Sequence, residues 1–301
     1  MNTMFALVSR NMKLFFKDKG MFFTSLITPV ILLVLYVTFL GKVYSDNMTS
    51  AFPEGFELSE KLLNGTVACE LFSSLLAVCC ITVAFCSNML MVQDKVTGAR
   101  NDFMVTPVKK QTLAIAYYIA TVCVTLIVCL ATTGLSFIYV ACVGWFLSVA
   151  DAFFILLDVF LLVLFGTALS SVVNYFLTSQ GQISAVGTVV SSGYGFICGA
   201  YMPISFFGEG LQKALSFLPG TYGTSLLRNH ALAGVFEEMQ AQNVPSEVIN
   251  NIKLSMDCNI SFFGNDVSVS AMYIVLTGTV VALIGAYVLI NVLGGRKEKK
   301  K

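Results

Sequence analysis

One uncharged stretch decides the fold class of this chain. Residues 71–92 read LFSSLLAVCCITVAFCSNMLMV, with Glu70 directly before them and Asp94 shortly after. At 1.5 Å of rise per residue, a helix of this length covers about 33 Å, and the hydrocarbon core of a bilayer is about 30 Å thick. The stretch therefore predicts a helix that crosses a membrane.

The composition of the whole chain agrees with a membrane protein. Of the 301 residues, 56% are hydrophobic and only 12% are charged, and the mean hydropathy is +0.81. Soluble domains carry about twice that share of charged residues, which they need to cover a water-facing surface. The net charge of +1 gives no reason to expect a nucleic-acid partner. A soluble fold is therefore not expected.

Six stretches are long and apolar enough to be membrane spans, and they predict an all-α integral membrane fold. They are residues 21–40, 71–92, 113–143, 152–173, 183–200 and 269–293. The third is longer than one straight crossing, so we expect it to tilt or to break near Gly134. The first lacks a signal-peptide cleavage pattern before Lys42 and is interpreted as a span. We expect residues 21–301 to form a single transmembrane domain.

The positions of Lys and Arg predict the orientation of the chain. Three segments hold 13 of the 18 positive residues: residues 1–20, the loop 93–112 and the tail after residue 293. Positive side chains near span ends stay on the cytoplasmic side. We therefore expect both termini in the cytosol, the segment 201–268 outside, and the plasma membrane as the location.

The N-terminal residues 1–20 have the pattern of an amphipathic helix. Apolar side chains gather on one face: Met4, Phe5, Val8, Met12, Phe15 and Phe16. Arg10, Lys13 and Lys17 lie on the opposite face. This pattern predicts an interfacial helix on the inner leaflet. It is either a basic anchor that fixes the topology or a lever linked to a cytosolic partner, and the pattern leaves both open.

The loop 93–112 is the largest charged loop expected inside the cell. Its glycine can end the helix of the second span, and its Thr-Pro pair can begin the next. The segment between them carries the residues that we expect to contact a cytosolic partner: Gly98, Arg100, Asp102, Phe103, Met104 and Val105. Phe103 and Met104 would otherwise be exposed apolar side chains, which favours a protein contact. The alternative is an ordinary connecting loop.

The sequence holds no recognisable catalytic site. It has no GxxxxGK(S/T) phosphate loop, no HExxH and no GxSxG. The single histidine, His230, has no cysteine or carboxylate at ligand spacing and is interpreted as structural. Seven cysteines lie in apolar runs and are interpreted as buried hydrophobes, whereas Cys69 and Cys258 lie in polar segments and could pair. We expect this chain to bind no cofactor and no metal.

Two further features could belong to a transport pathway. Asp158 lies in the fourth span, two helical turns after Asp151 on the same face and near the outer end. We expect it to line a hydrated vestibule or to pair with another residue, rather than to relay protons. Gly195 and Gly199 form a GxxxG step, which allows close approach of two helices. They either join two subunits through the fifth span and the ends of the first, or make room inside one subunit.

The outer segment before the last span is too broken to form another crossing. Pro203, Pro219 and several glycines divide it into short helices, a pattern typical of a hairpin that dips part-way into the membrane. We expect the re-entrant part to include Met202 and Leu211 as well. A further external helix is expected from Pro245.

A set of residues in this outer segment carries a family resemblance: Met202-Pro203, Phe206, Leu211-Gln212, Leu218-Pro219, Tyr222, Leu227-Arg228 and Gly234. Together with the amphipathic N-terminal helix, the six spans and the Thr-Pro-containing inner loop, these residues resemble the type-2 ATP-binding-cassette (ABC) exporter permeases. The resemblance covers nearly the whole chain. The long outer stretch after Gly234 departs from the family pattern.

The resemblance implies a dimer of permease subunits, two cytosolic ATPase subunits that carry ATP and Mg, and a pathway between the two permeases. It also implies that residues 1–20 form the connecting helix and that Gly98 to Val105 is the coupling helix. The expected function is export of a hydrophobic or amphipathic substrate such as a drug, a lipid or an antimicrobial peptide. Export of a lipid-linked polysaccharide stays open, as does an ion-coupled secondary transporter, which normally needs more ionisable residues inside its spans.

Overall fold

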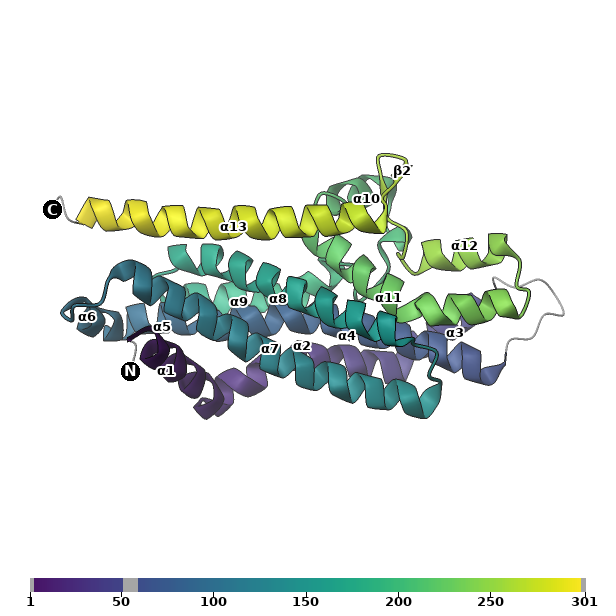
Figure 1. Ribbon diagram of the computed structural model, residues 1–301, viewed down its shortest axis with the longest axis horizontal. Helices are drawn as coiled ribbons and strands as arrows, with labels where there is room; N and C mark the ends of the chain where they lie inside the picture. Colours follow the sequence, from purple (N-terminus) through teal and green to yellow (C-terminus); the bar gives the residue numbers. More distant parts are fainter. Residues whose placement is uncertain (1–2, 51–58, 299–301) are drawn as a thin grey trace.

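The computed structural model describes residues 3–50 and 59–298, and long helices run side by side through it (Figure 1). α1 (Thr3–Lys17), α6 (Ala99–Met104) and the C-terminal part of α13 (Val269–Glu298) lie at one end of this bundle, called here the α6 end. α10 (Glu209–Leu215) and α12 (Ser246–Ser255) lie toward the opposite end, called the α12 end. Lys299, Lys300 and Lys301 of the basic tail lie outside the described residues.

Among the described residues, 5 helical stretches are long and apolar enough to cross a membrane. They are Lys19–Asp46, Glu60–Val96, Lys110–Val143, Val149–Phe176 and Val269–Val292. The first combines α2 (Lys19–Leu35), a π-helical turn (Tyr36–Leu40) and α3 (Gly41–Ser50). Together with the almost entirely helical chain, these stretches confirm an all-α membrane fold.

The sixth expected span, residues 183–200, is not among these stretches. It coincides with α9 (Gln180–Ile197), a helix of 18 residues that contains several glycines, serines and glutamines. These residues keep its hydropathy below that of the 5 candidate spans, although α9 packs against α2, α4 and α5 in the bundle (Figure 1). The prediction of six apolar spans is therefore not confirmed at this helix.

The centre of the fold is α4 (Glu60–Asn88), which packs against α2, α7 (Lys110–Val143), α8 (Val149–Phe176) and α11 (Pro219–Ala241). In its most apolar part, 89% of the residues are buried. α4 begins at Glu60, well before the expected start of the second span at residue 71. Glu70 was expected to bound that span, yet it lies within the helix and is 1% exposed. A partner for this carboxylate must therefore exist inside the protein.

The third and fourth spans begin and end cleanly. α7 runs without interruption through Gly134, so of the two expected alternatives the break is wrong and a tilted span stays a prediction. α8 begins at a capping box, in which Ser148 and Asp151 each bind the backbone N–H of the other. Asp151 therefore helps to start α8, and its expected place in a vestibule stays a prediction.

The outer segment is more regular than expected. The turn after α9 leads into a short 3-10 helix (Ile204–Phe206), then α10 (Glu209–Leu215) and α11, a largely buried helix of 23 residues. Pro219 occupies the first turn of α11, where its missing N–H costs nothing. α12 follows as the helix that was expected from Pro245. The strands β1 (Ser261–Phe262) and β2 (Asn265–Asp266) then pair in antiparallel register immediately before α13.

Candidate functional site

The link between α4 and α7 lies at the α6 end and consists of α5 (Leu90–Val96) and α6. Between these two helices, Gly98 has a φ of +83°. That left-handed conformation strains residues with a Cβ, so glycine is favoured at this turn. α6 is 6 residues long and occupies the segment that was expected to form a coupling element.

The side chains of α6 differ in exposure from what the sequence suggested. Asp102 is exposed, Val105 is 87% exposed, and Arg100 is half-buried. Phe103 is also half-buried, because its ring packs on an apolar cluster from α1, α5 and α7. The expectation of an exposed aromatic anchor at Phe103 is therefore wrong: the ring covers the protein's own apolar surface. The side chain of Met104 lies outside the described residues.

Arg10 of α1 connects the N-terminal helix to this link. It donates hydrogen bonds to both carboxylate oxygens of Asp94 in α5, at 2.6 and 3.0 Å. Its guanidinium also lies 5.0 Å from the centre of the Phe103 ring, which is cation-π geometry. Tyr117 of α7 donates to the same carboxylate at 2.5 Å. Side chains from α1, α5, α6 and α7 therefore lie together around one buried carboxylate. We call Arg10, Asp94, Phe103 and Tyr117 the Arg10 junction.

The basic residues of α1 differ in whether they are paired with a carboxylate. Lys13 and Lys17 are exposed, whereas Arg10 is held by Asp94. The hydrogen bonds to Asp94 raise the pKa of Arg10 above its usual value. Asp94 and Tyr117 could not be predicted as partners of Arg10, because a carboxylate just after an apolar run is typical of the boundary of a span. The only sequence feature that pointed to this contact is the presence of an amphipathic N-terminal helix and a charged loop on the same expected side of the membrane.

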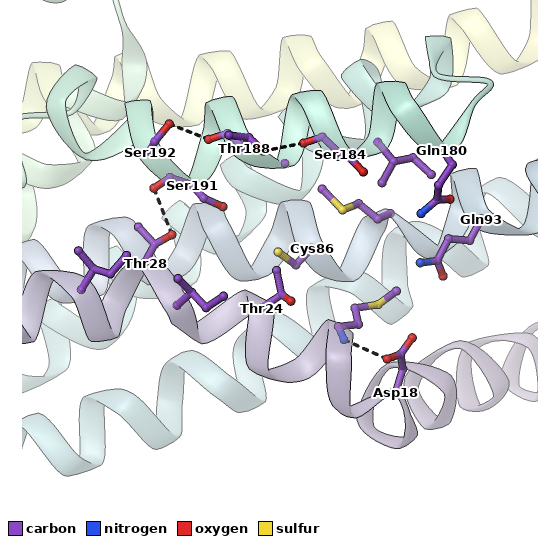
Figure 2. Close-up of a pocket in the computed structure, with 16 residues that line it drawn as sticks. Asp18, Thr24, Thr28, Cys86, Gln93, Gln180, Ser184, Thr188, Ser191 and Ser192 are labelled. Atoms are coloured by element: carbon purple, nitrogen blue, oxygen red, sulfur yellow. Dashed lines mark hydrogen bonds between the residues drawn. The ribbon is translucent and has the colours of Figure 1, made fainter.

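A groove of about 560 Å³ lies between α2 and α9, with part of α4 and α5 at its base (Figure 2). Hydroxyl side chains line much of it: Thr24, Thr28, Ser184, Thr188, Ser191 and Ser192. Thr188 and Ser192 donate to carbonyl oxygens one turn earlier in α9, at 2.9 and 2.7 Å. Their donors are thus satisfied while their oxygens can still accept hydrogen bonds. Isoleucine and methionine side chains form the apolar part of the lining, and Asp18, Gln93 and Gln180 add polar groups, so the groove is amphipathic.

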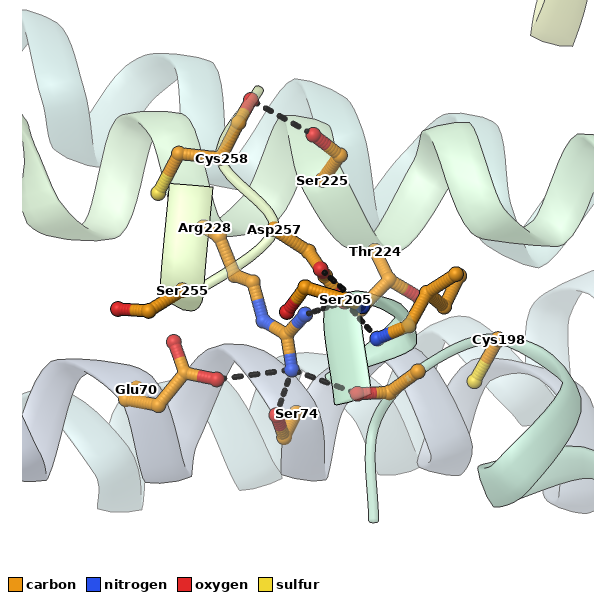
Figure 3. Close-up of polar contacts among 12 residues, drawn as sticks. Glu70, Ser74, Cys198, Ser205, Thr224, Ser225, Arg228, Ser255, Asp257 and Cys258 are labelled. Atoms are coloured by element: carbon orange, nitrogen blue, oxygen red, sulfur yellow. Dashed lines mark hydrogen bonds and ion pairs between the residues drawn. The ribbon is translucent and has the colours of Figure 1, made fainter. Parts of the chain in front are cut away.

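A second polar site lies inside the protein toward the α12 end, around Arg228 of α11 (Figure 3). Arg228 is completely buried, and its guanidinium lies 2.8 Å from Glu70 of α4 and 3.2 Å from Asp257, which follows α12. It also donates to Ser74 at 3.2 Å and to the carbonyl oxygen of Gly199 at 2.7 Å. One cation therefore ties α4, the turn after α9 and the end of α12 to α11.

Asp257 extends this Arg228 network to the 3-10 helix. Its carboxylate accepts hydrogen bonds from the backbone N–H of Ile204 and, at 3.2 Å, from that of Ser205. Burial raises the pKa of Asp257, and Arg228 and the two N–H groups only partly offset this effect. Among the groups around Asp257, Arg228 opposes this effect of burial the most.

Asp158 belongs to a separate buried cluster of three side chains. It is 0% exposed, accepts a hydrogen bond from Tyr273 of α13 at 2.5 Å and lies 2.6 Å from Nδ1 of His230 in α11. The His230 ring stacks on Phe154 at 4.9 Å. Asp158 is thus a pairing residue and does not line a hydrated vestibule. The sequence could not pair it with His230, because the two residues lie 72 positions apart on different helices.

The amino-acid sequence was compared with known protein families and with curated proteins. The profile of the ABC-2 type transporter family matches residues 2–231, which is more than two thirds of the chain. This chain belongs to the ABC-2 type transporter family. No curated protein matches the sequence. As an ABC-2 protein, the chain is a membrane-embedded permease subunit of an ABC transporter, and such subunits generally work with an ATPase subunit.

The ABC-2 family match ends within α11 and so covers most of the sites described above. In the outer segment, Met202 is half-buried, Pro203 is buried and Leu211 is 48% exposed. Arg228 lies inside the matched region, whereas its partner Asp257 lies beyond it. The part of the chain that departs from the family pattern therefore supplies one of the two carboxylates of the Arg228 network.

The two glycines proposed as a contact between ABC-2 permease subunits instead pack within one chain. A Cβ at Gly195 would lie 2.5 Å from the ring of Tyr201. Gly199 lies after the end of α9 with a φ of +76°, and a Cβ there would lie 3.0 Å from Ile204. These contacts favour the alternative that the two glycines make room inside one subunit, whereas pairing of two subunits through α9 and α2 stays a prediction. Cys69 and Cys258 are both free and buried.

Proposed function

We propose that this chain is the permease subunit of an ATP-driven exporter of hydrophobic or amphipathic molecules. In this proposal, two copies pair in the plasma membrane with both termini in the cytosol. Two cytosolic ATPase subunits bind ATP and Mg and dock at the α6 end. Their hydrolysis cycle opens and closes a pathway between the two permeases.

The groove between α2 and α9 is the observation that carries this proposal. A helix surface of serine and threonine hydroxyls is poorly suited to lipid, because hydroxyl oxygens find no donors there. The same surface suits a cargo with apolar and polar parts, or a second permease that completes a channel. α2 supports pairing in this region, since only 28% of its most apolar stretch is buried in one chain. Val189 and Phe196 of α9 are 66% and 51% exposed and are available for the same contact.

The α6 end supports docking of an ATPase. Asp102 and Val105 are exposed on or directly after α6, which connects the second and third spans. The Arg10 junction joins this element to α1. A displacement of α6 by the ATPase would therefore move both the spans and the N-terminal helix. This arrangement supports the interpretation of α1 as a lever rather than a passive anchor.

Closing the groove tests the proposed pathway. We expect Thr188→Trp to reduce transport and substrate-stimulated ATP hydrolysis of the permease–ATPase complex by at least about tenfold, because an indole fills space that the cargo needs. The measurement is uptake into inverted vesicles with a panel of amphipathic compounds. Thr277→Trp places the same side chain on the exposed face of α13 and should leave both activities near wild type. Equal activity of the two variants would contradict a pathway through this groove.

The Asp158 cluster favours one alternative function, an ion-coupled secondary transporter. A buried carboxylate paired with a histidine is the kind of site that moves protons through membranes. Under the exporter proposal the cluster is structural, so Asp158→Asn should retain ATP-dependent transport with an unchanged dependence on pH. The measurement is transport against external pH, with and without ATP. Transport that needs a proton gradient but no ATP, and that disappears in Asp158→Asn, would establish the alternative instead.

A further inference from the structure

Three phenylalanines meet on the surface of the outer segment. Phe217 lies between α10 and α11, and Phe262 and Phe263 lie in the β1–β2 hairpin. The ring centre of Phe217 lies 5.2 Å from that of Phe262 and 5.7 Å from that of Phe263. The ring centres of Phe262 and Phe263 lie 4.9 Å apart. Phe217 is 61% exposed and Phe263 is 57% exposed. We call these three residues the Phe cluster.

The backbone holds Phe263 at the tip of the hairpin in an unfavourable conformation. Phe263 has a φ of +51° and the following Gly264 a φ of +85°, as required at the two central positions of this tight turn. Asn or Gly normally occupies the first of these positions, and a bulky side chain there is strained. Such strain tends to occur where a side chain serves a function. The hairpin therefore presents an aromatic ring at a position that backbone preference alone would give to a small polar residue.

The hairpin lies directly beside the membrane-spanning part. β2 ends at Asp266 and α13 begins at Val269, so residues 267–268 alone separate the strand from the span. α13 is the least covered of the candidate spans, with 17% of its most apolar stretch buried, and Ile274 near its start is 73% exposed. In Figure 1 the hairpin lies next to the start of α13, whereas α12 extends beyond it. The Phe cluster therefore lies close to the start of a candidate span that is largely exposed in this chain.

We propose that the Phe cluster inserts into the interface region of the outer leaflet and anchors the outer segment to the lipid beside α13. Aromatic rings at this depth bury apolar area among the headgroups and upper acyl chains. The cluster contains rings from the hairpin and from the connection into α11. The anchor therefore fixes the hairpin and the N-terminal end of α11 at the same depth. This interaction is independent of the cargo and of the energy source proposed above.

Tryptophan fluorescence in defined vesicles tests the anchor. The chain has 1 tryptophan, so Trp145→Phe gives a background without indole. Into this background we would introduce Phe263→Trp or, separately, Phe217→Trp, and as a matched control Asn250→Trp on the exposed surface of α12. Each variant is reconstituted in phosphatidylcholine vesicles with and without bromine atoms near the top of the acyl chains. Bromine quenches indole only at short range.

The expected result is a loss of fluorescence in brominated vesicles for Phe263→Trp and Phe217→Trp, and no loss for Asn250→Trp. Two results would overturn the proposal. Red-shifted emission that bromine does not quench would place the rings in water. Blue-shifted emission that bromine does not quench would place them against a second copy of the chain. The second variant keeps the test valid if the strained turn at residue 263 does not accept an indole.

Discussion

Arg228→Met is expected to remove most of the folded protein from the membrane. The substitution keeps much of the side-chain volume but leaves Glu70 and Asp257 buried without their cation. Removing one partner of a buried ion pair costs about 3–5 kcal/mol, and whole domains are stable by only about 5–15 kcal/mol. The measurements are the yield of monodisperse protein in size-exclusion chromatography after detergent extraction, and its thermal unfolding.

Two controls separate the loss of charge balance from the loss of one side chain. Combining Arg228→Met with Glu70→Gln and Asp257→Asn removes the uncompensated charges, so much of the lost yield should return. Lys213→Met changes a residue whose side chain is 53% exposed, and we expect it to alter stability by less than about 0.5 kcal/mol. A wild-type yield for Arg228→Met would show that the outer segment does not need this network.

Arg10→Ala is expected to uncouple ATP hydrolysis from transport with only a moderate loss of stability. The variant leaves Asp94, whose side chain is 6% exposed, with the Tyr117 hydroxyl alone. A hydrogen bond to a charged group contributes about 1.5–3 kcal/mol, and the low end applies here because the Arg10 side chain is 30% exposed. α1 would then contact α6 only through the apolar cluster under Phe103, and Phe103 would lose the cation above its ring. The measurement is substrate transported per ATP hydrolysed in the reconstituted complex.

The N-terminal helix offers a matched control for this variant. Lys13→Ala removes an exposed positive charge from the same helix and should leave the coupling ratio near wild type. Exchanging the charges, with Arg10→Asp and Asp94→Arg in one chain, should restore part of the coupling if the pair itself matters. An unchanged coupling ratio in Arg10→Ala would show that α1 is only an anchor.

Several elements could be predicted from the sequence because the relevant signal is local. A helix in lipid satisfies its own backbone hydrogen bonds, so about twenty apolar residues are sufficient evidence for a span. The stretch 71–92 and the last span near residue 269 were found in this way. The turn at Gly98 and the helix after Pro245 follow from equally local signals, namely a left-handed glycine and an amphipathic repeat.

α9 shows where this local signal fails. Its glycines and serines lower the hydropathy, yet the helix lies within the bundle and forms one wall of the groove. Gly195 and Gly199 likewise matched a pattern for helix contact, but Tyr201 and Ile204 of the same chain fill the space beside them. A pattern of small residues indicates that another part of the protein packs closely against the helix. It does not identify whether that part belongs to the same chain or to a second subunit.

The sequence by itself determined that this chain is a helical membrane protein, where 5 of its candidate spans lie and which family it belongs to. Only the tertiary structure decided which charges are paired. Arg10 meets Asp94 across 84 positions, Asp158 meets His230 across 72, and Arg228 meets Asp257 across 29. Burial inside the protein makes an unpaired charge expensive, so each buried charge must find a partner. Helix packing supplies that partner from a distant part of the chain, and no local pattern records which one it will be.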